Sequence, residues 1–190
     1  MSNCYTKEEL INLGVKIYGD NIHISKFANI YNPSNLILHD NIRIDDFTII
    51  SCNGIIEIFN YVHISAQCFI SSTTKIIIGN FSAISVGSKI FGGCDDFSGE
   101  YLANPTIPKK YTNVKIGDII IGDNVIIGSN SVIMPDITIN EGAVIGANSF
   151  VNKSCEVWKI YAGSPIKFIK NRKKNCLVIL EEFRKNTVLL

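Results

Sequence analysis

The sequence lacks the features that mark nucleic-acid binding, zinc coordination or membrane insertion. Its formal net charge is +1, without the concentrated basic excess that a general nucleic-acid binder usually carries. Its six cysteines form no CxxC pair and its three histidines are not paired, so no metal site is expected. No stretch approaches the roughly 18 uncharged apolar residues that a membrane span needs. We therefore expect neither nucleic acid nor a membrane among its partners.

A secretion signal is also missing from the start of the sequence. The first residues, MSNCYTKEELINLG, have neither the basic start nor the apolar core of a signal peptide. Scattered cysteines are typical of free thiols in a reducing cytosol. These observations predict a cytoplasmic protein.

What the sequence has instead is a six-residue repeat in its C-terminal half. Aliphatic residues recur at every sixth position, at Ile121, Ile127, Ile133, Ile139, Ile145 and Val151. A small or branched residue fills the fifth place of each six, at Val125, Ser131, Ile137, Ala143 and Ser149. An α-helix would scatter every sixth residue, and a single strand alternates every two. Six is the period of one flat side of a triangular parallel β-coil, whose aliphatic residues stack into a buried column.

Upstream, the same repeat has a stride of 20 residues. Three series keep this spacing: Tyr18, Leu38, Ile58 and Ile78; Ile24, Ile44, Ile64 and Ile84; and Ile30, Ile50, Ile70 and Ile90. A further inward column is expected at Ala28, Thr48, Cys68 and Ser88. Each turn therefore has 18 repeat residues and two extra ones, expected at a corner near Asn35–Leu36, Ile55–Ile56 and Lys75–Ile76. The repeat predicts an all-β fold, a parallel β-helix over residues 18–152.

Two segments flank the predicted coil. Residues 1–17 are expected to cap its first turn, with a short helix from Thr6 to Asn12 in which Thr6 and Glu9 form the N-terminal cap. Residues 153–190 begin with a basic segment and end in a short helix. We expect this helix to pack on a neighbour, because its apolar residues have roughly helical spacing. These residues are Leu177, Leu180, Phe183 and Val188.

The repeat is interrupted at about residues 91–115. A long loop inside a strict repeat is more often functional than accidental. Its apolar side chains argue against disorder. They are Phe91, Phe97, Tyr101, Leu102 and Tyr111. We therefore expect an ordered excursion loop.

The hexapeptide run, the excursion loop and the ending Tyr161-Ala-Gly-Ser-Pro-Ile-Lys-Phe-Ile resemble the left-handed β-helix acyltransferases. Among these, the sequence resembles the maltose and galactoside O-acetyltransferases and the sugar acyltransferases of surface-polysaccharide pathways. This resemblance covers about residues 18–172. It implies a left-handed coil and a homotrimer with active sites between neighbouring prisms. It also implies that acyl-CoA lies along each cleft, and that a loop histidine deprotonates the acceptor hydroxyl.

The resemblance places two departures at the centre of the site. The position of the loop histidine is occupied by Asp95, which Asp96 follows, and the position of a pocket asparagine is occupied by Ser65. Asp95 or Asp96 as base suits an amine acceptor, because a carboxylate with a pKa near 4 is a poor base for a hydroxyl. His63 is the alternative base, with an ordinary pKa of about 6.5. It also fits a plain surface column with His23 and Arg43.

For the cofactor, the resemblance implies contacts in the C-terminal half. Ser129 and Ala147 match positions whose main chain meets the pantetheine arm. Asn152 and Lys153 match the nucleotide end of the donor, and Lys167 matches a basic residue that meets a CoA phosphate. Arg172 extends this basic patch. The alternative interpretation of these tail charges is a solvated basic end.

The predicted function is therefore that of a CoA-dependent acyltransferase. It uses acetyl-CoA, needs no metal, and acetylates a hydroxyl or amine of a sugar or nucleotide sugar. One alternative is a β-helix that has lost catalysis and serves as a scaffold or binding subunit. Another is a carbonic-anhydrase-like metal site, which needs about three converging histidines. Of His23, His39 and His63, only two share a column, which disfavours that site.

Overall fold

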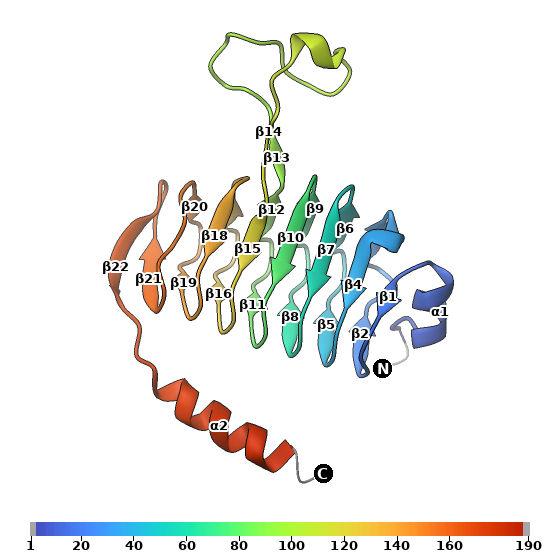
Figure 1. Cartoon of the computed structure of the whole chain (residues 1–190), viewed down its shortest axis with the longest axis vertical. Coiled ribbons are helices and arrows are strands. Elements are labelled where there is room, and N and C mark those ends of the chain that lie inside the picture. Colours follow the sequence, from blue (N-terminus) through green and yellow to red (C-terminus); the bar gives the residue numbers. More distant parts are fainter. Residues whose placement is uncertain (1–2, 188–190) are drawn as a thin grey trace.

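The computed structural model describes residues 3–187 and shows a parallel β-helix with three sides (Figure 1). The first sheet contains β1 (Lys16–Ile17), β4 (Leu36–Leu38), β7 (Ile55–Ile58), β10 (Lys75–Ile78), β15 (Ile119–Ile121) and β18 (Ile137–Ile139). The second contains β2 (Ile22–Ile24), β5 (Ile42–Ile44), β8 (Val62–Ile64), β11 (Ala83–Ile84), β16 (Ile126–Ile127), β19 (Val144–Ile145), β21 (Lys159–Ala162) and β22 (Lys167–Asn171). The third contains β3 (Asn29–Tyr31), β6 (Ile49–Cys52), β9 (Phe69–Ser72), β12 (Lys89–Phe91), β17 (Val132–Ile133) and β20 (Phe150–Val151). The predicted fold class is confirmed.

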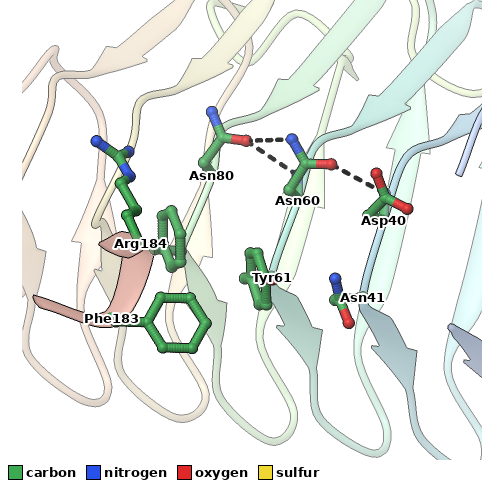
Figure 2. A pocket seen from close by; sticks show the side chains of 8 residues that line it. Asp40, Asn41, Asn60, Tyr61, Asn80, Phe183 and Arg184 are labelled. Carbon is green, nitrogen blue, oxygen red and sulfur yellow. Dashed lines mark hydrogen bonds between the residues drawn. The ribbon is translucent and has the colours of Figure 1, made fainter. Parts of the chain in front are cut away.

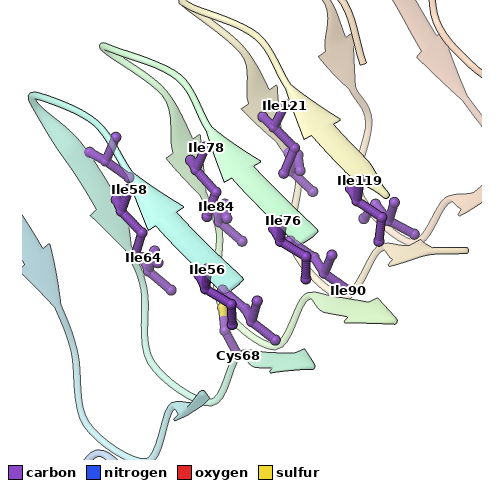
Figure 3. Packing of buried hydrophobic residues seen from close by; sticks show 14 of the residues in the cluster. Ile56, Ile58, Ile64, Cys68, Ile76, Ile78, Ile84, Ile90, Ile119 and Ile121 are labelled. Atoms are coloured by element: carbon purple, nitrogen blue, oxygen red, sulfur yellow. The ribbon is translucent and has the colours of Figure 1, made fainter. Parts of the chain in front are cut away.

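The core consists of stacked isoleucine columns that run along the axis of the coil. Ile58, Ile78 and Ile121 form one such column and are fully buried (Figure 3). The parallel register pairs Ile44 with Ile64 and Ile64 with Ile84, as the 20-residue spacing predicts. Each fully buried aliphatic side chain contributes about 1.5–3 kcal/mol to folding, so these columns are the main source of stability.

Two local predictions about the repeat are wrong. Tyr18 is 71% exposed, because Ile17 takes its expected place opposite Leu38. The extra residues of the long turns lie at residues 53–54 and 73–74 rather than in the strands that follow. The last residues of β6 and β9, Cys52 and Ser72, are fully buried, so each corner begins after them. A Cβ atom at Gly54 would collide with the backbone of Thr74, so this corner requires glycine.

The N-terminal end of the coil is closed by α1 (Lys7–Asn12). The Thr6 hydroxyl accepts a hydrogen bond from the Glu9 amide at 3.1 Å, and the Glu9 carboxylate accepts one from the Thr6 amide at 2.7 Å. This reciprocal cap is the one predicted from the sequence. Leu10 is fully buried and covers the first coil.

The C-terminal segment folds back along the corner between the first and second sheets. The parallel ladder continues through β21, past residue 152, and β22 pairs with it antiparallel. Arg172 donates hydrogen bonds to the carbonyls of Asn124 (2.6 Å) and Gly142 (3.0 Å). The chain then enters α2 (Asn175–Thr187).

Helix α2 packs on two aromatic corner residues of its own chain. The Phe183 ring meets the Tyr61 ring edge-on, with ring centroids 5.2 Å apart (Figure 2). Arg184 lies over the Phe81 ring, 5.5 Å from its centroid. Beside them, the Asn60 side-chain amide donates a 2.8 Å hydrogen bond to the Asn80 side-chain oxygen (Figure 2). The helix therefore packs on its own chain. Of the apolar residues predicted for this helix, Val188 lies outside the described residues. Within residues 3–187, helices are too short or too polar to cross a membrane.

Candidate active site

The excursion loop stands on a two-stranded stalk and projects away from the prism (Figure 1). Strands β13 (Gly93–Cys94) and β14 (Lys115–Ile116) form the stalk, and a 3-10 turn (Lys109–Tyr111) lies near its tip. At its base lies a groove of about 600 Å³, between the loop and the ends of β17 and β20. Asp95, Phe97, Phe150 and Asn152 are among its lining residues.

The two loop acids have different surroundings in this groove. The Asp96 carboxylate accepts a 2.6 Å hydrogen bond from the Ser98 hydroxyl, so it is used in turning the loop. The half-buried Asp95 carboxylate accepts no hydrogen bond within residues 3–187. Burial, and after it the charge of Asp95, raises the pKa of the neighbouring Cys94 thiol. Asp95 is therefore the acid that is free to act on a ligand, and Cys94 stays a neutral thiol at pH 7.

His63 does not share this groove, because it lies on the second sheet. Its Nε2 atom is 2.8 Å from Oδ2 of Asp45, whose Oδ1 atom accepts a 2.6 Å bond from Arg43 Nε. Burial alone would raise the pKa of Asp45, but the hydrogen bonds from His63 and Arg43 outweigh it, and the pKa is lowered. The register places His23, Arg43 and His63 in one outward column, as the repeat predicts. His63 and Asp95 are thus two separate candidates in one chain.

The corner between the second and third sheets carries the other candidates. We call it the serine edge; it comprises residues 25–27, 45–47, 65–67, 85–87, 128–130 and 146–148. The amide of Ser65 donates to the Ile84 carbonyl and that of Ser85 to the Ile127 carbonyl, both at 2.9 Å. The hydroxyls of Ser65 and Ser85 have no hydrogen-bond partner in the described part of the chain. Sequence reasoning missed Ser85, although its 20-residue spacing from Ser65 was a usable signal.

The predicted donor residues continue along the same edge. Ser129 and Ala147 lie in adjacent coils, and the Ser129 carbonyl accepts a 2.8 Å bond from the Asn148 amide. A Cβ atom at Gly128 would lie 2.5 Å from the Ala147 amide nitrogen, so the coils here are too close for a larger residue. Such small residues let a ligand approach the backbone.

The basic residues predicted for CoA differ in their exposure and contacts. Lys153 and Lys167 are exposed, and Lys167 lies on β22. Arg172 binds backbone carbonyls and lies over the Trp158 ring at 5.4 Å, so its visible role is to anchor the C-terminal segment. Within residues 3–187, no cluster of three potential metal ligands is found.

Comparison with known proteins identifies the family. The model described as "Bacterial transferase hexapeptide (six repeats)" matches residues 118–153. The dTDP-4-amino-4,6-dideoxy-D-glucose acyltransferase of Escherichia coli is 36% identical over 181 residues, covering 95% of this chain and 94% of that protein. The chain belongs to the hexapeptide-repeat acyltransferases.

Solved structures of this family match over nearly the whole chain. AntD, an N-acyltransferase from Bacillus cereus in complex with dTDP and 3-hydroxybutyryl-CoA, superposes with a TM-score of 0.94 at 41% identity. The match covers 98% of this chain and 99% of AntD. An AntD variant with a serine replaced (TM-score 0.93, 40% identity, 98% and 100% covered) holds dTDP-4-amino-4,6-dideoxyglucose and coenzyme A. Another has an aspartate replaced ten positions after that serine. A maltose O-acetyltransferase from Clostridium difficile shares the fold, with a TM-score of 0.57 at 24% identity and 88% and 75% covered.

Proposed function

We propose that this hexapeptide-repeat acyltransferase transfers an acyl group from a CoA thioester to the amino group of a dTDP-linked 4-amino-4,6-dideoxy sugar. The observation that carries the proposal is the end-to-end similarity to two proteins. The E. coli enzyme is named for this amino sugar, and an AntD variant holds the amino sugar together with coenzyme A. The expected sugar or nucleotide-sugar acceptor is thereby narrowed to an amine. Acetyl-CoA is the donor expected from the sequence, and the free cysteines favour a reducing cytosol.

The free carboxylate of Asp95 supports an amine acceptor. As the amine attacks the thioester carbonyl, a C–N bond forms and the amine nitrogen must lose a proton. Asp95 accepts that proton, while the C–S bond breaks and the departing CoA sulfur takes up a proton. A neutral amine is nucleophilic before it loses a proton and needs only this proton acceptor, whereas a hydroxyl is a weak nucleophile until a stronger base removes its proton.

Ser85 is the second residue of the proposed reaction centre. It precedes Asp95 by ten positions, the separation of the serine and aspartate replaced in AntD. Its free hydroxyl is suited to donate a hydrogen bond to the thioester oxygen as charge develops there. However, Ser85 lies before β12 and the Asp95 groove lies beyond its far end. The seven residues from Ser85 to Phe91 include the extended strand β12, so Ser85 and the groove lie at opposite ends of this strand, up to roughly 20 Å apart.

We therefore propose a homotrimer in which Asp95 of one copy meets Ser85 of the next. The exposed apolar residues of the loop support a covering neighbour: Phe97 is 84% exposed and Ile116 is 50% exposed. In this arrangement Ser129, Ala147, Asn152 and Lys153 accompany the donor. Lys167 is left to meet a CoA phosphate, together with any free guanidinium donor of Arg172.

The test is a reaction of purified protein with acetyl-CoA and dTDP-4-amino-4,6-dideoxyglucose. We expect release of the CoA thiol and a product heavier by one acetyl group, with no comparable thiol release when maltose replaces the amino sugar. Light scattering is expected to give three times the chain mass of 21.0 kDa. Binding of acetyl-CoA without turnover of the amino sugar would instead support the scaffold alternative, and a monomer would exclude the shared site.

A further inference from the structure

The N-terminal half of the serine edge carries an exposed aromatic pair. Phe27 and Phe47 lie in adjacent coils, with ring centroids 5.7 Å apart and planes 25° from parallel. Their side chains are 50% and 60% exposed. A stacked pair of exposed aromatic rings presents a flat apolar surface of the kind on which a nucleobase stacks.

Phe47 adopts a backbone conformation that disfavours its side chain. Its φ is +59°, whereas the equivalent corners of later coils with positive φ carry Gln67, Gly87, Asn130 and Asn148. A bulky residue in this region is uncommon and is strained unless surrounding contacts offset the strain. At the other edge, Tyr61 and Phe81 share the conformation, but α2 covers them. Within residues 3–187, only Phe27 contacts the Phe47 ring as an aromatic partner.

The pair lies at a suitable distance from the proposed reaction centre. Asp45, which begins the corner that contains Phe47, is two coils from Ser85. Adjacent strands are about 4.8 Å apart, so this separation is roughly 10 Å. That is close to the span of a diphosphate and a pentose.

A cation lies in the same coil as Phe47, because Arg43 on β5 precedes the corner that carries this ring. The Arg43 side chain is 55% exposed and uses Nε for Asp45, and its terminal amino groups have no partner in the described residues. Asp45 is also bonded by His63, which leaves its carboxylate with two cationic or polar partners. Arg43 is therefore held in place with its fork open to a phosphate.

We propose that Phe47, stacked on Phe27, is the platform for the thymine base of the acceptor nucleotide, with Arg43 meeting its diphosphate. This inference rests on the proposed function and adds the location of the nucleotide. The donor then occupies the C-terminal half of the serine edge and the acceptor nucleotide occupies the N-terminal half. The amino sugar reaches Ser85 between them.

The test is calorimetric binding of dTDP to the full-length protein and to Phe47→Asn. Asparagine tolerates positive φ, so this variant loses the ring without straining the corner. We expect dTDP to bind roughly tenfold more weakly, while coenzyme A and inorganic pyrophosphate bind as they do to the parent protein. Phe27→Ala is expected to weaken dTDP binding in the same direction. Tyr18→Ala is the matched control, because Tyr18 is 71% exposed, contacts a ring, and lies on another edge.

Each outcome decides between the two proposals. Unchanged dTDP affinity in Phe47→Asn, with normal turnover of the amino sugar by the parent protein, would overturn this inference and leave the proposed function intact. A parent protein that binds no dTDP and turns over no amino sugar would overturn both. A changed oligomer mass in Phe47→Asn would show that the ring contacts another copy, and would also overturn the platform.

Discussion

The two halves of the serine edge share the same backbone arrangement but carry different side chains. In the C-terminal coils its residues are small, such as Ser129 and Ala147, and the main chain is accessible. In the N-terminal coils Arg43 and His63 flank the edge, and Phe47 stands on it with a strained backbone. Both halves continue the same parallel ladders, so the backbone alone does not distinguish them.

In the proposed arrangement, this difference explains how one repeat recognises two unlike ligands. Small residues let a long, flexible arm contact backbone amides and carbonyls, which suits the pantetheine arm of CoA. Charged and aromatic side chains instead recognise a specific phosphate and base. Outward residues of a β-helix change freely because the core columns already fix the fold. In the proposed arrangement, the outward side chains therefore carry the binding functions.

The largest expected effect is at the proposed reaction centre, where Asp95 of a neighbouring copy is expected to meet Ser85 between the two halves. Asp95→Asn is expected to lower turnover of the amino sugar by about 10²–10⁴-fold, because the proton acceptor is lost. Coenzyme A and dTDP affinities should change little. The measurement is steady-state kinetics with both substrates varied.

His63→Ala is the comparison variant for Asp95→Asn. If Asp95 is the base, His63→Ala keeps most of kcat. The reverse pattern would make His63 the base. Near-normal kcat in both variants would mean that no side-chain base is needed, and our assignment would be wrong.

A smaller effect is expected when the C-terminal half is given a large side chain. Ala147→Phe places a ring where the donor arm is proposed to lie, and should weaken acetyl-CoA binding roughly tenfold, equivalent to about 1.4 kcal/mol. Binding of dTDP should be unaffected. Ser129→Ala is the control, because it preserves a small residue and the backbone contacts. Equal loss of dTDP and acetyl-CoA binding would refute the division of the edge.

The smallest effect concerns the carboxylate that holds Arg43 and His63. The pKa of Asp45 in the folded protein is below its ordinary value of 3.8, so its ionised form stabilises the native state above about pH 4. That contribution is lost as the pH falls through the lowered pKa. Asp45→Asn should reduce the unfolding free energy at pH 7 by about 0.5–1 kcal/mol. Its thermal stability should also fall less steeply below pH 4; parallel acid profiles for the two proteins would contradict this.

The sequence predicted the core far better than the corners. Burial explains the success: every sixth position must be apolar, so Ile64, Ile84 and their columns leave a period that can be read directly. The cap at Thr6 was equally readable, because its hydrogen bonds are local. Tyr18 was misplaced because nothing local distinguishes the last buried residue of a strand from the first exposed one after it.

The sequence by itself determined the coil and its excursion loop, because the repeat is a one-dimensional pattern imposed by stacking. The tertiary structure alone decided which outward residues lie together. It separated His63 from Asp95, joined His63 to Asp45, left the Ser85 hydroxyl without a hydrogen-bond partner among residues 3–187, and turned α2 back onto its own chain. The physical reason is that outward side chains meet water in any register. Their spacing is therefore not constrained by burial, as that of the core residues is, and it cannot be read from the sequence. Only the folded backbone brings them together.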